Sequence, residues 1–339
     1  MSGGLPLRAM HSLAREVEEA GFAGLWITES GRTAYGACTA AALATAHLDL
    51  GTGIAVAFPR SPMVTAQAAW ELQEATGGRF TLGLGTQVKG HIERRYSSPF
   101  EHPGPRLREY VLALKAIFRA FRGEEPLAFE GDFYRFSLLP ALWSPGPIDA
   151  PDPPVYLAGV NPWMCRAIGE VADGIHVHPL HSLRYLEEVV RPSIEAGAAK
   201  AGRAAGEVAV VCPLLTNVGE TDAELATWRE RARLQLAFYG STRTYSRVFE
   251  VHGWDGTSER LHEQQAKGDF AAMAGTLTDE MLEVFTLTAS WDGLADAIVE
   301  RYTGIADRVI CYFAATAWRD DPATKERWTA VAAEVAARA

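Results

Sequence analysis

The segment from residue 155 to residue 179 combines two groups of residues that could act on a ligand. Its first half ends in Gly159, and Asn161 followed by a proline is typical of the start of a helix. A glycine turn leading into a helix leaves free backbone N–H groups at the positive end of the helix dipole, which favours an anion such as phosphate. His176 and His178 lie in the second half. The pattern predicts a strand–helix–strand unit with an anion site, although an ordinary turn with incidental histidines explains this segment equally well.

The two histidines also raise the question of a metal. At positions i and i+2 of a strand, His176 and His178 face the same side, and His181 lies nearby. A hydrolytic zinc site would need a carboxylate and further histidines from other strand ends. The last predicted strand ends in Tyr312-Phe313 without an aspartate. The sequence therefore favours a pocket wall or a hydrogen-bond donor for His178, and it predicts no metal site.

Two other segments place glycine or polar residues directly after predicted strands. Glu29 follows a buried run and is suited to proton transfer or to holding a ligand hydroxyl, while capping of the next helix is the structural alternative. The run 82–85 has alternate glycines and is followed by Gln87 and Lys89. Glycines at a strand end let a flat ligand or its phosphate approach the backbone, with tight packing against a helix as the alternative.

Strand-like and helix-like segments alternate along most of the chain. The strands are short, continuous apolar runs, which indicates a parallel sheet covered on both faces. Seven of them over this length predict an α/β fold of the TIM (β/α)8 type whose first strand is lacking or truncated, because the chain opens on a helix near Leu13. A doubly wound open sheet is the alternative, but no G-x-G-x-x-G follows the first strand. The predicted strands comprise residues 24–28, 48–58, 79–85, 155–159, the stretch around His176, 208–213 and 308–313.

Two irregular regions interrupt the alternation, near 123–154 and near 219–291. The first contains a hairpin tip at residues 130–134, and the second opens with a capping box that begins at Thr221. Neither resembles a linker long enough to separate two folds, so residues 1–339 are expected to form a single domain.

The amino-acid composition limits the kinds of molecule that this protein is expected to bind. A net charge of -10 argues against nucleic acid and anionic membranes, since both need a basic face. The four cysteines show no CxxC spacing, which suits reduced thiols. The amino terminus lacks the apolar core of a signal peptide, and no apolar run reaches the ~18 residues needed to cross a membrane. We therefore expect a cytoplasmic protein that acts on a small organic molecule.

Several ordered motifs resemble the luciferase-like monooxygenase superfamily. The glutamine-to-arginine stretch 87–95 is similar to its coenzyme F420-dependent oxidoreductase branch, although F420 and FMN occupy the same barrel mouth in this superfamily. The motifs are residues 51–57 with Arg60-Ser61-Pro62, Gly78-Arg79-Phe80 with residues 82–85, and Ala158-Gly159 with residues 169–174.

The resemblance implies a TIM barrel, usually dimeric, that binds F420 or, alternatively, FMN on its carboxyl rim. It implies a non-prolyl cis peptide at Gly53–Ile54 beneath the ring, a loop from Gly85 to Lys89 beside it, and the phosphate on the backbone of residues 159–161. Glu29 and His178 are the candidates for proton handling. The candidate cofactor-binding residues are Gly53, Ile54, Ala55, Gly85, Gln87, Lys89, Gly159, Val160, Asn161 and His176.

The function implied is hydride transfer between F420 and a small organic substrate. An FMN-dependent monooxygenase and a non-catalytic flavin-binding paralogue are the alternatives. The chain departs from the family pattern in two places. Many relatives have an acidic residue followed by histidine where this chain has Glu29-Ser30, and family members normally begin with a strand before the first helix.

Overall fold

A parallel sheet organises the computed structural model, which describes residues 4–338. Its strands follow chain order around a nearly closed barrel, so the arrangement is TIM-like and the doubly wound alternative is excluded. These are the strands that the sequence predicts. Along the path they are β1 (Gly24–Ile27), β2 (Asp49–Thr52), β4 (Phe80–Gly85), β7 (Val155–Gly159), β8 (Gly174–Val177), β9 (Ala209–Leu214) and β12 (Arg308–Cys311), and the short β3 (Ala55–Val56) pairs with β4.

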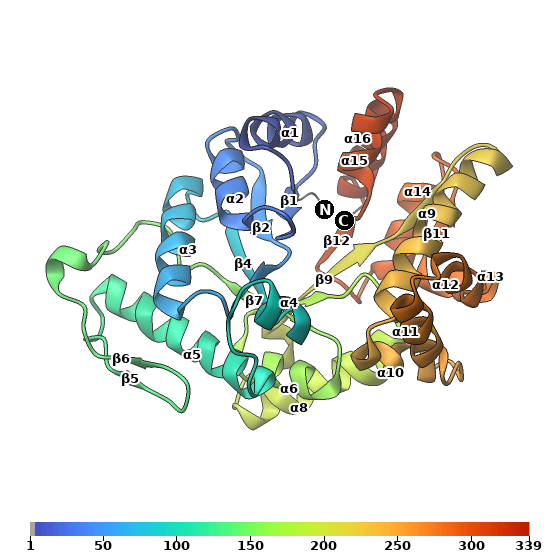
Figure 1. The fold of residues 1–339 in the computed structure, drawn as a ribbon. Helices are drawn as coiled ribbons and strands as arrows, with labels where there is room; N and C mark the ends of the chain where they lie inside the picture. Colours follow the sequence, from blue (N-terminus) through green and yellow to red (C-terminus); the bar gives the residue numbers. More distant parts are fainter. Residues whose placement is uncertain (1–3, 339) are drawn as a thin grey trace.

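The sheet stays open at one seam. In the part of the chain that the structure describes, β12 pairs only with β9 and β1 pairs only with β2. The two edge strands lie on either side of the seam, with α1 beside one and α15 and α16 beside the other (Figure 1).

Helices cover the outside of the barrel. Local sequence sets their ends: Ser61 caps α3 by accepting a hydrogen bond from the Val64 amide, and Gly77 ends it with a φ of 62°. The first helix begins at Leu7, earlier than the predicted start near Leu13. The main helices are α1 (Leu7–Glu19), α2 (Ala34–Ala42), α3 (Pro62–Thr76), α5 (Pro103–Arg122), α6 (Pro162–Val171), α8 (Arg191–Lys200), α14 (Leu294–Tyr302), α15 (Ala314–Asp320) and α16 (Ala323–Ala336).

Short helical segments connect these elements. The sequence predicts one helix from Ser182 to Ala201, whereas the structure divides this stretch into α7, a π-helical stretch and α8. The short segments are α4 (Lys89–Arg94), α7 (Leu183–Tyr185), the π-helix η2 (Leu186–Val190) and the 3-10 turn η3 (Ala205–Glu207).

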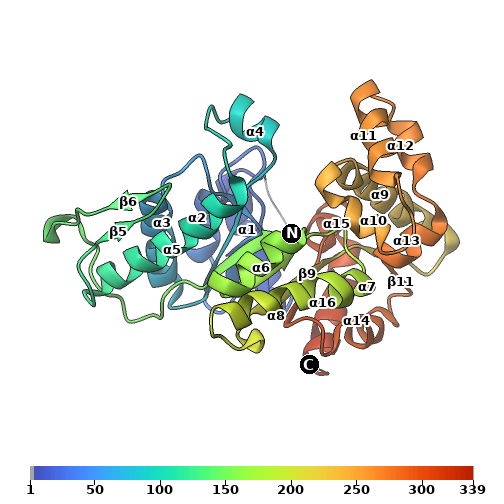
Figure 2. The same cartoon turned by 90° about the horizontal axis from the view of Figure 1, so that it is seen from below.

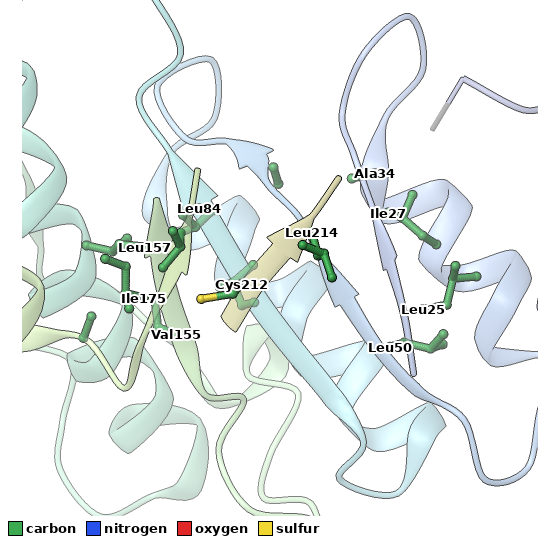
Figure 3. Packing of buried hydrophobic residues seen from close by; sticks show 14 of the residues in the cluster. Leu25, Ile27, Ala34, Leu50, Leu84, Val155, Leu157, Ile175, Cys212 and Leu214 are labelled. Atoms are coloured by element: carbon green, nitrogen blue, oxygen red, sulfur yellow. The ribbon is translucent and has the colours of Figure 1, made fainter. Parts of the chain in front are cut away.

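Alternation along the strands separates an outer core from the barrel interior. Outward residues such as Leu25, Leu157 and Ile175 pack beneath the helices (Figure 3). Inward residues are in register with one another around the sheet, and a compact cluster of Trp26, Val211 and Ile310 fills the interior against Tyr156. The interior is therefore a packed core below the rim rather than a channel.

The excursion at 123–154 leaves the barrel as a small hairpin, as expected from residues 130–134. Strands β5 (Phe129–Glu130) and β6 (Arg135–Phe136) pair antiparallel, and the 3-10 turn η1 (Ala141–Trp143) follows. Glu109 of α5 organises the turn, because its carboxylate accepts hydrogen bonds from the amides of Asp132, Phe133 and Tyr134 at 2.7–2.9 Å. One scaffold side chain thus fixes the hairpin tip.

The excursion at 219–291 is mostly helical and lies on the opposite side of the molecule from the hairpin (Figure 2). Its capping box is confirmed, since Thr221 and Glu224 exchange hydrogen bonds at the start of α9. Over the described residues, no helix is both long and apolar enough to cross a membrane. The elements are α9 (Asp222–Gly240), η4 (Arg243–Tyr245), α10 (Ser246–Glu250), α11 (Thr257–Lys267), α12 (Phe270–Thr276) and α13 (Asp279–Phe285), with β10 (Thr216–Val218) parallel to β11 (Leu287–Ala289).

Candidate functional site

Most of the candidate cofactor residues meet at the carboxyl ends of neighbouring strands. Val56 of β3 is in register with Gly85 of β4, and Ala158 of β7 is in register with His176 of β8. Because β4 also pairs with β7, the segment 53–55, Gly85, residues 159–161 and His176 form one continuous stretch of the rim. The peptide bond Gly53–Ile54 is cis, as the resemblance predicts.

Glycines allow close packing along this stretch of the rim. A Cβ atom added to Gly53 would lie 2.7 Å from His176 Nε2, and one added to Gly85 would lie 2.9 Å from the Cδ1 atom of Ile54. Any larger residue would therefore displace its neighbours at these two positions. At Gly159 the added Cβ would lie 2.6 Å from Ile168 Cδ1, so that glycine also serves the packing of α6 on β7.

The turn into α6 has the geometry expected of an anion site. Asn161 Oδ1 caps the helix by accepting a hydrogen bond from the Met164 amide at 2.9 Å. The first i−4 bond of α6 is donated by Cys165 N to the Asn161 carbonyl, so the amides before it lie at the positive end of the helix. The Tyr185 hydroxyl donates to the Val160 carbonyl and fixes the turn from outside.

The Glu29 side chain connects the end of β1 to β3. Its Oε2 atom accepts hydrogen bonds from the Val56 amide at 2.7 Å and from Arg60 Nη1 at 2.9 Å, and Oε1 pairs with Arg60 Nη2 at 2.5 Å. Both oxygens are thus engaged, and the side chain is almost fully buried. This geometry holds the segment that carries the cis peptide. The role of Glu29 in proton handling remains a prediction.

His178 directly follows β8 and lies among aromatic rings. Its ring centre is 4.6 Å from that of Tyr239 and 4.5 Å from that of Tyr245. The Leu180 amide donates to Nδ1 at 3.1 Å, so the neutral ring carries its proton on Nε2. Burial lowers the pKa of His178 to about 3, which keeps the ring neutral near pH 7. The Tyr239 and Tyr312 hydroxyls are hydrogen-bonded to each other.

His176 contributes an unsatisfied acceptor to the interior. Its Nδ1 lies 3.3 Å from the Val177 carbonyl, which places the proton on Nδ1, and Nε2 has no hydrogen-bond partner among the described residues. Burial lowers the pKa of His176 to about 4. A neutral imidazole nitrogen facing Gly53 can therefore accept a hydrogen bond from a ligand N–H or O–H. Within residues 4–338, no group of three His, Cys, Asp or Glu side chains is positioned to hold a metal ion.

Gln87 and Lys89 lie on the loop that follows β4. Gln87 has a φ of 57°, in the left-handed region, and its side-chain Oε1 accepts from the Val88 amide at 2.9 Å. Lys89 is exposed at the start of α4 and is 3.7 Å from Glu93. The loop therefore lies beside the glycine stretch, but both side chains are occupied in local contacts.

Comparison with known proteins identifies the family. The model of the family described as luciferase-like monooxygenase matches residues 1–308. The chain belongs to this family. The uncharacterised protein Rv1360 of Mycobacterium tuberculosis is 41% identical over 317 residues, covering 93% of each chain. The 5,10-methylenetetrahydromethanopterin reductase of Archaeoglobus fulgidus is 31% identical over 293 residues, covering 84% of this chain and 82% of that protein.

Solved structures agree on the fold of this family member. The coenzyme F420-dependent tetrahydromethanopterin reductase of Methanopyrus kandleri superposes with a TM-score of 0.78 at 23% identity, covering 100% of this chain and 97% of that one. An F420-dependent secondary alcohol dehydrogenase gives 0.68 at 16% identity, with coverage of 99% and 98%. Both of these structures are of F420-dependent enzymes, whereas another structure with the same fold is a long-chain alkane monooxygenase, and the family is one of flavin or deazaflavin oxidoreductases.

Two features of the site were missed by sequence reasoning. Arg60 was recognised only as part of a motif, whereas the structure shows it to be the partner of Glu29. Tyr239 and Tyr245 come from the helical excursion, where no motif marked them. A buried acid at a strand end is a signal that a cation lies nearby, and it could have prompted a search for Arg60.

Proposed function

We propose that this protein is an F420-dependent oxidoreductase that transfers a hydride to or from a small organic substrate. The observation that carries the proposal is the continuous glycine stretch of the rim, which joins the cis peptide Gly53–Ile54, Gly85 and the start of α6 on neighbouring strands. The relationship to the 5,10-methylenetetrahydromethanopterin reductases supports F420 as the cofactor, because the tetrahydromethanopterin reductase of Methanopyrus kandleri is F420-dependent.

The residues at the rim fit such a group. Glycine at positions 53 and 85 lets His176 and Ile54 pack directly against the backbone at the rim, and the unsatisfied His176 Nε2 can accept a hydrogen bond from a ring N–H. The amides at Val160 and Asn161, at the start of α6, would hold the phosphate. Bound F420 would supply or accept the hydride.

The chain's own part in the reaction is orientation and control of protons. Glu29, held by Arg60, keeps residues 53–56 in place, and these residues would support the ring of the cofactor. His178 is neutral near pH 7, so its Nε2–H can donate a hydrogen bond to a substrate oxygen or nitrogen but adds no positive charge. The rings of Tyr239 and Tyr245 exclude water from that imidazole.

Titration of the purified protein with F420 and with FMN tests the proposal. Binding is followed by quenching of cofactor fluorescence and by isothermal calorimetry. We expect a micromolar or tighter complex with F420 and at least about tenfold weaker binding of FMN, a difference of about 1.4 kcal/mol. Binding of FMN alone would instead favour a monooxygenase, and binding of neither would contradict both enzymatic functions.

A further inference from the structure

Four aromatic side chains from distant parts of the chain meet at the end of β8. His178 follows β8 and Tyr312 follows β12, whereas Tyr239 and Tyr245 come from α9 and η4 of the helical excursion. The His178 ring centre lies 4.6 Å from that of Tyr239 and 4.5 Å from that of Tyr245, and the Tyr239 and Tyr312 hydroxyls share a hydrogen bond. We call these four residues the aromatic cluster. Each of them keeps part of its surface exposed, so a small ligand can reach the cluster.

The cluster presents hydrogen-bond donors and flat apolar surface to such a ligand. His178 Nδ1 accepts a hydrogen bond from the Leu180 amide, so Nε2 carries the proton. Because the Tyr245 ring lies against the same imidazole, the Nε2–H group and the Tyr245 hydroxyl are two donors within reach of one small ligand. The tyrosine rings favour contact with a flat apolar surface. A flat molecule with an oxygen acceptor would use both features.

The aromatic cluster is electrically neutral near pH 7. Burial lowers the pKa of His178 to about 3 and raises the pKa of Tyr245 to about 12. Burial also raises the pKa values of the other two tyrosines. In the described part of the chain, the titratable groups that act on His178 are His181 and His176, and their own pKa values of about 4 keep them neutral as well. A ligand would therefore meet dipoles in the cluster and no net charge.

Arg231 brings a positive charge near the cluster, but a carboxylate compensates it. Its guanidinium lies 4.3 Å from the Phe313 ring, which contacts the Tyr312 ring, and 3.9 Å from the Asp320 carboxylate. A charged ligand in the cluster would therefore give up its water shell without gaining an ion-pair partner there. A neutral ligand gives up only polar contacts with water, which the two donors replace. Burial in the cluster thus favours the neutral ligand.

The aromatic cluster lies next to the proposed cofactor site. His178 is two residues after His176 and faces the same side, and His176 Nε2 faces Gly53. We propose that the aromatic cluster binds an uncharged, flat substrate through an oxygen acceptor and discriminates against carboxylates and ammonium groups. The identification of this ligand as the substrate rests on the proposed function, whereas the preference for an uncharged ligand does not. Tyr245, which supplies both a ring face and a hydroxyl, is the specificity-determining residue.

Three probes of nearly equal shape test this proposal: benzamide is neutral, benzoate is an anion and benzamidinium is a cation. The histidines are labelled with nitrogen-15, and the Nε2 resonance of His178, assigned from its loss in His178→Gln, is followed during each titration. We expect benzamide to shift this resonance and to bind at least about tenfold more tightly than either charged probe. The titrations are made without F420 and repeated with it. Selective binding of benzamide by a protein that fails to bind F420 would contradict the proposed function but support this inference.

Variants at Tyr245 test the same preference from the side of the protein. Tyr245→Arg places a cation beside His178, so benzoate should bind at least about tenfold more tightly than benzamide. Phe238→Arg is the matched control, because it adds the same charge at an exposed position of α9 and should leave the order unchanged. Tyr245→Phe keeps the ring and should weaken benzamide binding several-fold. Charged probes that bind as tightly as benzamide, no shift of the His178 resonance with any probe, or an unchanged order in a folded Tyr245→Arg variant would each overturn the proposal.

Discussion

The two halves of the barrel mouth differ in the residues that form them. In the half formed by β2, β3, β4 and β7, buried glycines at positions 53, 85 and 159 let neighbouring side chains pack directly against the backbone. The half formed by β8 and its neighbours is crowded with rings around His178, contributed partly by the helical excursion. Backbone contacts persist when side chains change, which suits a cofactor shared across a family. Side chains from an excursion can change with the substrate.

The largest effect should follow from removing the carboxylate that supports the glycine half. Glu29→Ala leaves the Val56 amide without a partner and the half-buried Arg60 without its carboxylate, and we expect a loss of about 3 kcal/mol in the free energy of unfolding. Denaturant unfolding measures it. Glu29→Gln, which can still accept the amide hydrogen bond, should lose less. Equal stability of the wild type and the alanine variant would show that the pair does not hold residues 53–56.

A large side chain in the glycine half should strongly weaken binding of the cofactor. In Gly85→Leu the new side chain would collide with Ile54 and occupy the rim, so we expect F420 affinity to fall by about a hundredfold, or about 2.7 kcal/mol. Gly90→Leu is the matched control, because a Cβ at Gly90 meets nothing within 4 Å. Both variants are checked by circular dichroism. If Gly85→Leu bound F420 as tightly as the wild type, the glycine half would not be the half that binds the cofactor.

Acid should destabilise the protein through the histidine half. Burial lowers the pKa values of His176 and His181 to about 4, below the unfolded value of 6.5. Between these values the unfolded state binds more protons, so this contribution to stability is complete above pH 6.5 and is lost as the pH falls toward 4. Each histidine should contribute a slope of up to about 1.4 kcal/mol per pH unit.

Unfolding free energies measured from pH 7 to pH 4 check this slope. The His181 ring is held between the His178 carbonyl and the Tyr302 hydroxyl. His181→Gln removes this titrating group, so the unfolded state should take up roughly one proton fewer relative to the folded state, and the dependence of stability on pH should be less steep. A slope that is the same in the variant and the wild type would place the acid sensitivity elsewhere in the molecule.

The smallest effect separates helix capping from anion binding. Asn161→Ala and Thr278→Ala each remove a helix cap, and each should cost about 1 kcal/mol of stability. Only Asn161 belongs to the proposed phosphate site, so only its variant should weaken F420 binding, by several-fold. Equal F420 affinities for the two variants would mean that α6 does not hold the phosphate.

The strands of the barrel were predictable because each is a short apolar run bounded by glycine, proline or a polar turn. The same local signals identified the cap at Asn161 and the hairpin tip at residues 130–134. The order of the strands around the barrel follows from their regular alternation with helices. These features depend on residues close together in the sequence, where periodicity and turn chemistry are informative.

The contacts that complete the site could not be predicted in the same way. The pairing of Glu29 with Arg60 and the packing of Tyr239 on His178 join residues that are distant in sequence. The division of residues 182–201 by a π-helix was also missed, since the apolar pattern there continues without a break. Such features arise from the way neighbouring elements meet, which a single sequence does not record.

The attachment of the hairpin through Glu109 has an evolutionary consequence. One carboxylate of α5 receives three amides of the turn, and its position leaves no space for a side chain at Gly131, where an added Cβ would lie 2.3 Å from the carboxylate. These contacts involve backbone amides and therefore do not depend on the identity of the other tip residues. Substitutions around the tip can accumulate without moving the hairpin, provided that positions 109 and 131 are retained.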